Sequence, residues 1–228
     1  MDRVFAFLEK SMIPLVGRVS RNPYLLAIRD AFVILMPFIL TASFFGIFEW
    51  VILDPWGPIL GETGLDLGST ITGGLRGEEY KAAGLIQHLQ ILQGLCNTMV
   101  TVGFGMLSFF LTAALAYRLA VLWHGDRVVS IFVALGAFVI VTPQKLGGQA
   151  GFGMDYFGSK GVMTALLVAI GATWLFTRFS RIKKLYIHMP ANVPEEISRY
   201  FAILLPVMLT LCIFALFATG LAQGQFLG

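Results

Sequence analysis

Five long apolar runs, separated by polar or charged segments, dominate the pattern of this chain. They cover residues 31–48, 85–117, 128–141, 161–176 and 201–222. A helix needs roughly 20 mostly apolar residues to cross a bilayer, so the pattern predicts about five spanning helices. The run at 128–141 is the shortest and stops just before Pro143, which leaves open whether it crosses fully.

The second run, at 85–117, is longer than one crossing requires, and its first part is rich in amides. It fits either one long tilted helix or a polar approach segment followed by a span. Pro37 lies within the first run and Pro206 within the fifth. Membrane helices tolerate such prolines where neighbouring groups satisfy the freed carbonyl.

The composition agrees with a bilayer environment. Hydrophobic residues make up 57% of the 228 residues and charged residues only 13%, with a mean hydropathy of +0.80. An ordinary soluble domain has about 25% charged residues, so this chain has too few to cover a water-exposed surface. The expected fold class is an all-α polytopic membrane helix bundle, not a soluble enzyme.

The N-terminal residues 1–22 have a different pattern. Apolar side chains recur there at three- and four-residue steps, and charges interrupt any signal-peptide core. This spacing predicts an amphipathic helix, which fits either the membrane interface or the protein's own cytoplasmic face. The apolar positions are Phe5, Leu8, Met12, Leu15, Val16 and Val19.

The basic residues predict the orientation, because Lys and Arg concentrate in cytoplasmic loops. In a five-span arrangement with the N-terminus inside, the N-terminal segment and the loops at 117–127 and 178–199 share one side. That side holds twelve of the sixteen basic residues: Arg3, Lys10, Arg18, Arg21, Arg29, Arg118, Arg127, Arg178, Arg181, Lys183, Lys184 and Arg199. The opposite side holds Arg76, Lys81, Lys145 and Lys160. Basic residues placed by topology give no reason to expect nucleic acid as a partner.

Polar side chains in the second run are the best candidates for substrate binding. They are Gln87, His88, Gln90, Gln93 and Asn97, of which Gln90, Gln93 and Asn97 fall on one helix face. Polar groups at bilayer depth usually face a bundle interior or a water-filled cavity, and amides suit hydroxyl-rich sugars. Two alternatives remain: an interfacial segment that reaches water, and hydrogen bonding between protomers.

Other chemistry is sparse. No nucleotide-binding, metalloprotease or serine-hydrolase motif is present, and we expect no cofactor, no metal and no catalytic residue. Cys96 and Cys212 lie in apolar stretches and are expected to be buried small hydrophobes. The basic segment 178–199 is predicted to be a cytoplasmic linker that anchors the topology, with docking of a cytoplasmic partner as the alternative.

Several strings resemble the membrane component of a bacterial sugar phosphotransferase system, enzyme IIC of the lactose/cellobiose/diacetylchitobiose type. The string FAFLEKSMIPLVGRVSRNPYLLAIRDAFVILMPFILTASFF resembles the family's opening, and LTAALAYRLA resembles the end of its second span. The fourth span is similar in MDYFGSKGVMTALLVAIGATWLFTRF, and the most specific string is HMPANVPEEISRYFAILLP. The matches are in order along essentially the whole chain.

The resemblance implies a sugar permease of the inner membrane that works with a cytoplasmic enzyme IIB carrying a phosphocysteine. It implies a homodimer, which the N-terminal half of the family's proteins forms. This chain, 1–228, resembles that half and is expected to be a single membrane domain. The family's second half supplies the sugar site with its essential His and Glu. Neither His88 nor Glu195 matches that motif, and Cys96 does not match the phosphocysteine.

The expected function is therefore a partial permease domain for a cellobiose-like oligosaccharide, not an enzyme and not competent for transport alone. The alternative is an enzyme-IIC-like membrane sensory domain of a signalling protein, such as a cyclic-di-GMP phosphodiesterase. The sequence does not identify the sugar.

Overall fold

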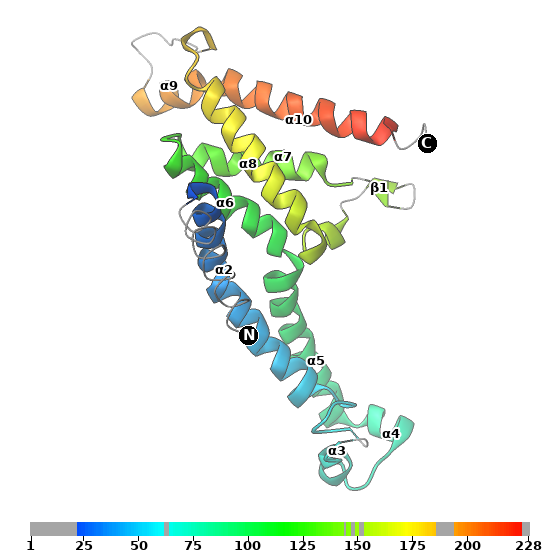
Figure 1. The fold of residues 1–228 in the computed structure, drawn as a ribbon. Coiled ribbons are helices and arrows are strands. Elements are labelled where there is room, and N and C mark those ends of the chain that lie inside the picture. The colour runs from blue at the N-terminus through cyan, green and yellow to red at the C-terminus, as the bar shows by residue number, and fades with distance from the viewer. Residues whose placement is uncertain are drawn as a thin grey trace, which may run out of the picture. The chain divides into compact units, whose positions relative to one another are not determined.

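The computed structural model describes residues 22–61, 64–143, 145–146, 149–150, 153–185 and 194–224 (Figure 1). The predicted amphipathic helix at 1–22 lies outside these residues except for Asn22. The elements are α2 (Pro23–Ile47), the π-helical turn η1 (Phe48–Leu53), α3 (Leu67–Ile71), α4 (Gly77–Ala82), α5 (Gly84–Val100), the π-helical turn η2 (Thr101–Gly105), α6 (Leu107–Leu122), α7 (Arg127–Val141), the two-residue strands β1 (Lys145–Leu146) and β2 (Gln149–Ala150), the 3-10 turns η3 (Met154–Tyr156) and η4 (Ser159–Gly161), α8 (Val162–Phe179), the 3-10 turn η5 (Lys183–Leu185), α9 (Glu195–Ala202) and α10 (Leu204–Gly224).

The chain divides into two compact units, one formed by residues 1–35 with 108–228 and the other by residues 36–107. The helix α2 contributes to both units. The all-α fold class is confirmed, with the short antiparallel pairing of β1 and β2 as a minor addition.

The core of the larger unit lies between α6, α7, α8 and α10. Within it α7 packs on α8 and on α10 (Figure 1). Leu111, Leu115 and Leu119 of α6 are fully buried, as are Phe138 of α7 and Phe176 of α8. Buried alanines recur on the same helices, and such small side chains let membrane helices approach closely.

The turn before α8 is fastened to the start of α6. The backbone N–H of Ser108 donates to Phe157 O at 2.7 Å, and its Oγ donates to Gly158 O at 2.5 Å. The Phe157 ring packs against Phe109 at 5.7 Å and against Phe138 at 5.6 Å between ring centroids. The turn ends at Gly161 and α8 begins at the next residue, Val162. The contacts of the turn with Ser108 therefore fix where α8 begins.

An ion pair joins the first half of α2 to α6. The Asp30 carboxylate accepts hydrogen bonds from Arg118 and, at 2.8 Å, from its neighbour Arg29. Near this pair, the Tyr24 ring meets the Trp123 ring edge-on at 6.0 Å. Both Asp30 and Arg118 are partly shielded from solvent, so the two helices are held together by a charged contact as well as by apolar packing.

In the smaller unit, the second half of α2 lies against the end of α5 and against η2 (Figure 1). Gly103 of η2 leaves no room for a side chain, since a Cβ there would lie 2.2 Å from Ala42 Cβ and 3.1 Å from Phe38 O. Gly46 lies near Val100 with room to spare, since its hypothetical Cβ would make an ordinary 3.6 Å contact with a Val100 methyl. Gly103 and Ala42 thus set the distance between α2 and η2.

Two helices begin at residues other than those predicted from hydropathy, because capping groups and prolines also determine where a helix starts. The first helix begins at Pro23, eight residues before the apolar run, because Asn22 Oδ1 accepts from Tyr24 N at 3.0 Å and proline suits the first helical position. The fifth run is divided at Ile203, and α10 places Pro206 in its first turn, where its missing N–H costs little.

The second apolar run is not one continuous α-helix: α5, η2 and α6 follow each other with a break at Met106. The third run is confirmed as a helix, since α7 covers Arg127–Val141. By length and hydropathy, the described residues hold two helices able to cross a membrane, Pro23–Leu53 and Ser159–Phe179, or three if α5–η2 and α6 count as one broken span. The helices α7 and α10 are apolar but shorter, so the count of five crossings stays a prediction.

Candidate functional site

The predicted polar face lies on α5. Gln87, Gln90 and Asn97 are exposed and Gln93 is half-buried. With 3.6 residues per turn, Gln90, Gln93 and Asn97 lie within about 60° of one another around the helix axis. The opposite side of the same helix carries the exposed apolar side chains Leu95 and Met99, whereas the buried Cys96 lies about 60° around the axis from Gln93.

His88 departs from this face. It lies about 160° around the helix from Gln90, and its Nδ1 is 2.6 Å from Gly84 O, one turn back. Asn97 keeps its amide on the polar face, where its Oδ1 accepts a hydrogen bond from Thr101 Oγ1 at 3.1 Å. The structure therefore brings the three amides together and separates the imidazole from them.

Amide groups can both donate to and accept from sugar hydroxyls. The amides of Gln90, Gln93 and Asn97 could therefore bind a hydroxyl-rich ligand held between α5 and a second protein surface. No contact in the described residues tests this role, and the substrate-binding assignment of the five residues stays a prediction.

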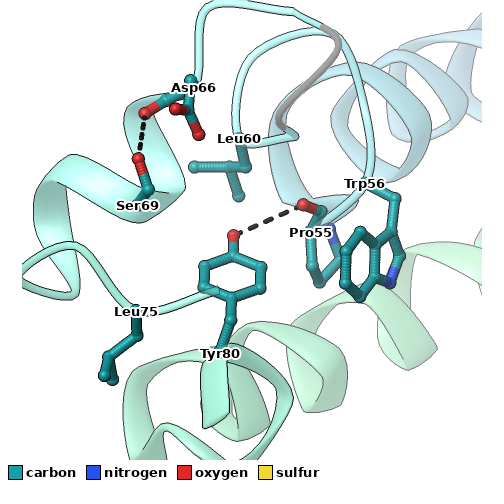
Figure 2. Close-up of a pocket in the computed structure, with 7 residues that line it drawn as sticks. All are labelled: Pro55, Trp56, Leu60, Asp66, Ser69, Leu75 and Tyr80. Atoms are coloured by element: carbon teal, nitrogen blue, oxygen red, sulfur yellow. Dashed lines mark hydrogen bonds between the residues drawn. The ribbon is translucent and has the colours of Figure 1, made fainter. Parts of the chain in front are cut away.

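A second polar cluster lies in the segment between η1 and α5 (Figure 2). The Tyr80 side chain is only 4% exposed, and its hydroxyl donates to Pro55 O at 3.3 Å. Its ring meets the Trp56 ring edge-on at 5.7 Å. Gly68 lies against the same hydroxyl, because a Cβ there would come within 2.0 Å of the Tyr80 oxygen.

Asp66 shapes the other side of this cluster. Its backbone is left-handed, with a φ of 52°, and its carbonyl accepts from Ser69 Oγ at 3.1 Å, as Figure 2 shows. Its carboxylate accepts from Arg76 at 3.3 Å. Burial, together with the negative charges of Asp66 and Asp54, raises the pKa of the Tyr80 phenol, so that hydroxyl remains a hydrogen-bond donor at neutral pH.

The cluster around Tyr80 leaves no room for a water molecule between its side chains. It is a packing centre that orders the connection between α2 and α5, not a ligand site. Sequence reasoning missed it, although an aromatic pair inside a glycine-rich segment was a usable signal.

In the part of the chain that the structure describes, no group of three His, Cys, Asp or Glu side chains gathers. Of the two cysteines, Cys96 is buried as expected and Cys212 is exposed, which corrects the prediction that both are buried. Cys212 lies on the outward face of α10, a position that hydropathy alone does not distinguish from a core position.

Comparisons with known proteins place these features in a family. Residues 29–225 match the family described as "Phosphotransferase system, EIIC". The chain is 27% identical over 219 residues to the oligo-beta-mannoside-specific EIIC component of Bacillus subtilis, covering 93% of this chain and 43% of that protein. It is 26% identical to the cellobiose-specific EIIC component of Geobacillus stearothermophilus, covering 90% of this chain and 43% of that protein.

A solved structure is similar over the same extent. The crystal structure of ChbC, the IIC component of the N,N'-diacetylchitobiose-specific phosphotransferase system, matches with a TM-score of 0.67 and 25% identity. The match covers 92% of this chain and 46% of ChbC. The chain thus spans less than half the length of the relatives it matches.

Proposed function

This chain belongs to the phosphotransferase system EIIC family, and we propose that it forms the N-terminal, scaffolding part of an oligosaccharide permease. The observation that carries the proposal is the match over nearly the whole chain to less than half of each permease. The relatives are named for oligo-beta-mannosides, cellobiose and diacetylchitobiose. These names support a short β-linked oligosaccharide as the substrate class.

The polar face of α5 supports a role in the sugar pathway that depends on further polypeptide. Gln90 and Asn97 are exposed along a helix otherwise rich in apolar residues. Polar groups in a membrane are costly unless they face protein or water. We therefore assign Gln87, Gln90, Gln93 and Asn97 to a surface that the rest of the permease completes around the sugar. His88 lies on another side of α5 and is left out of this surface.

Partners follow from the same family. Relatives from Staphylococcus are named lactose-specific EIICB components, which supports a cytoplasmic IIB protein as the phosphoryl donor to the sugar. We place segment 178–199 on the cytoplasmic side as its neighbour, since Arg178, Arg181, Lys183 and Lys184 are all exposed. This assignment puts the N-terminus in the cytoplasm and the protein in the bacterial inner membrane.

A homodimer is the proposed assembly. An apolar hollow of about 270 Å³ lies between α2 and α5–η2, lined by Phe38, Met99, Val102 and their neighbours. Phe38 is 50% exposed and Met99 49% exposed. In the dimer, a second copy of the chain would cover this apolar surface.

Sugar uptake tests the proposal that the chain does not transport alone. Cells that lack their own β-glucoside permease but retain the IIB protein would receive either this chain or a full-length oligo-beta-mannoside EIIC component, with labelled cellobiose supplied outside. We expect the full-length relative to restore uptake and this chain to remain at the empty-vector background. Immunoblots of the membrane fraction confirm that both proteins are inserted. Uptake above background by this chain alone would contradict the proposal.

A further inference from the structure

A polar cavity of about 350 Å³ lies at one end of the larger unit. Three segments line it: residues 124–126 between α6 and α7, the end of α8 at residues 176–181, and Ile203 before α10. All three are at helix ends. In a membrane protein, helix ends lie near the headgroup layer, where polar ligands and lipids both reach the surface.

Two residues that line this cavity have hydroxyl groups without hydrogen-bond partners, and neither hydroxyl oxygen is exposed to the cavity. Thr177 is 5% exposed, and its Oγ1 is buried without a partner, as is the Oγ of Ser180 one turn further along α8. An unpaired buried hydroxyl is costly, and each such group in a native protein calls for an explanation. Rotation of either side chain about χ1 would turn its hydroxyl toward the cavity, where a ligand that accepts hydrogen bonds would pair with it.

The lining holds one guanidinium, which can donate to an anionic ligand, and one carboxylate, which caps α7. Arg181 donates one hydrogen bond to Trp123 O, and a guanidinium has five N–H donors. Asp126 is the acidic group on the lining, and its Oδ1 already accepts from Val128 N and Val129 N at 3.1 Å each as the N-cap of α7. His124 lies beside them on the same turn. Guanidinium and hydroxyl donors together match the oxygens of a phosphate group.

Arg181 also borders a second, apolar hollow of about 400 Å³. Its other lining residues are Trp174, Leu175, Phe179, Ile182 and a second arginine, Arg178; Trp174 is 50% exposed. Tryptophan is enriched at the level of lipid headgroups. One arginine therefore separates a polar cavity from an apolar one, an arrangement that suits a ligand with a charged head and a hydrocarbon tail.

We propose that this end of α8 is a binding site for an anionic phospholipid. The headgroup phosphate lies in the polar cavity against Arg181, Thr177 and Ser180, and an acyl chain follows the hollow beside Trp174. The apolar hollow favours a lipid over free phosphate, because an inorganic ion would leave it unused. Basic pockets at helix ends are known to bind anionic headgroups by the same physics.

Native mass spectrometry of the purified full chain tests the site. After exchange into lipid-free detergent, the chain is titrated with phosphatidylglycerol or with phosphatidylcholine carrying the same acyl chains. We expect a stoichiometric adduct with phosphatidylglycerol that exceeds the phosphatidylcholine adduct. Arg181→Gln should weaken that adduct about tenfold, the loss expected when a charge-assisted hydrogen bond is removed.

Two pairs of variants separate the site from general effects. Lys184→Gln removes the same charge from an exposed residue that borders neither cavity, and should leave lipid binding unchanged. Thr177→Val removes the hydroxyl and should weaken binding, whereas Thr173→Val, one turn earlier and also buried without a partner, should not. Circular dichroism and elution volume check the fold of each variant.

Three results would overturn the proposal. Equal retention of the two lipids would remove the selectivity for an anionic headgroup. Equal losses in Thr177→Val and Thr173→Val, or in Arg181→Gln and Lys184→Gln, would remove the site. Displacement of the lipid by millimolar inorganic phosphate would show that a free ion is the better ligand and contradict the lipid assignment.

Discussion

Gly161→Ala is expected to destabilise the larger unit by about 3 kcal/mol, at the upper end of the usual cost of overpacking. A Cβ at this position would lie 1.8 Å from Tyr156 O and 3.3 Å from Ser108 Cβ. The clashing atom is backbone and cannot rotate away, so the turn must move. That turn is bonded to Ser108 and packed on Phe109 and Phe138. The start of α8 would move with it.

Unfolding by a denaturing detergent, followed by circular dichroism, measures this change. Gly220→Ala is the matched control, because it lies in α10 with nothing within 4 Å of the added methyl. The control should lose no stability and can gain up to about 1 kcal/mol from helix propensity. Similar midpoints for Gly161→Ala and Gly220→Ala would show that the turn before α8 is looser than the structure has it.

Gly103→Ala is expected to destabilise the smaller unit by about 2 kcal/mol. The added methyl would lie 2.2 Å from the buried Ala42 Cβ and 3.1 Å from Phe38 O, so α2 and η2 must separate. Helix propensity favours alanine by about 1 kcal/mol at most, which the clash outweighs. The apolar hollow lined by Phe38 and Val102 would change shape as well.

The comparison variant for this site is Gly94→Ala on the neighbouring helix α5, where nothing lies within 4 Å of the new Cβ. The two substitutions add the same methyl, yet we expect opposite signs in the same detergent unfolding experiment. A stabilising Gly103→Ala would mean that α2 and η2 do not pack closely in the membrane. It would also remove the structural basis for the proposed dimer surface.

The sequence predicted best those elements whose local signals agree. α7 follows its apolar run almost to the residue, because Asp126 caps its start and Pro143 follows its end. The first helix was predicted eight residues too short, since a hydropathy pattern marks the apolar part of a helix and not its polar first turns. The break at Met106 gave no recognisable sequence signal.

The candidate sites also differ in whether local sequence signals could predict them. The amides of α5 could be placed on one face because a helix period relates residues that are near in sequence. The polar cavity could not be foreseen, because it needs Asp126, Thr177 and Ile203 to meet from three separate segments. Likewise, no periodicity predicts that Tyr80 would contact Pro55 across a connecting segment.

Sugar binding by the purified chain tests the central claim most directly. The claim is that this chain is the scaffolding part of an EIIC permease and needs further polypeptide to complete a sugar site. Isothermal titration with cellobiose, lactose and diacetylchitobiose, with a full-length EIIC relative as the positive control, measures it. We predict saturable binding by the relative and none by this chain. Saturable binding by this chain alone, lost in Gln90→Ala or Asn97→Ala, would contradict the account and place the sugar site on α5.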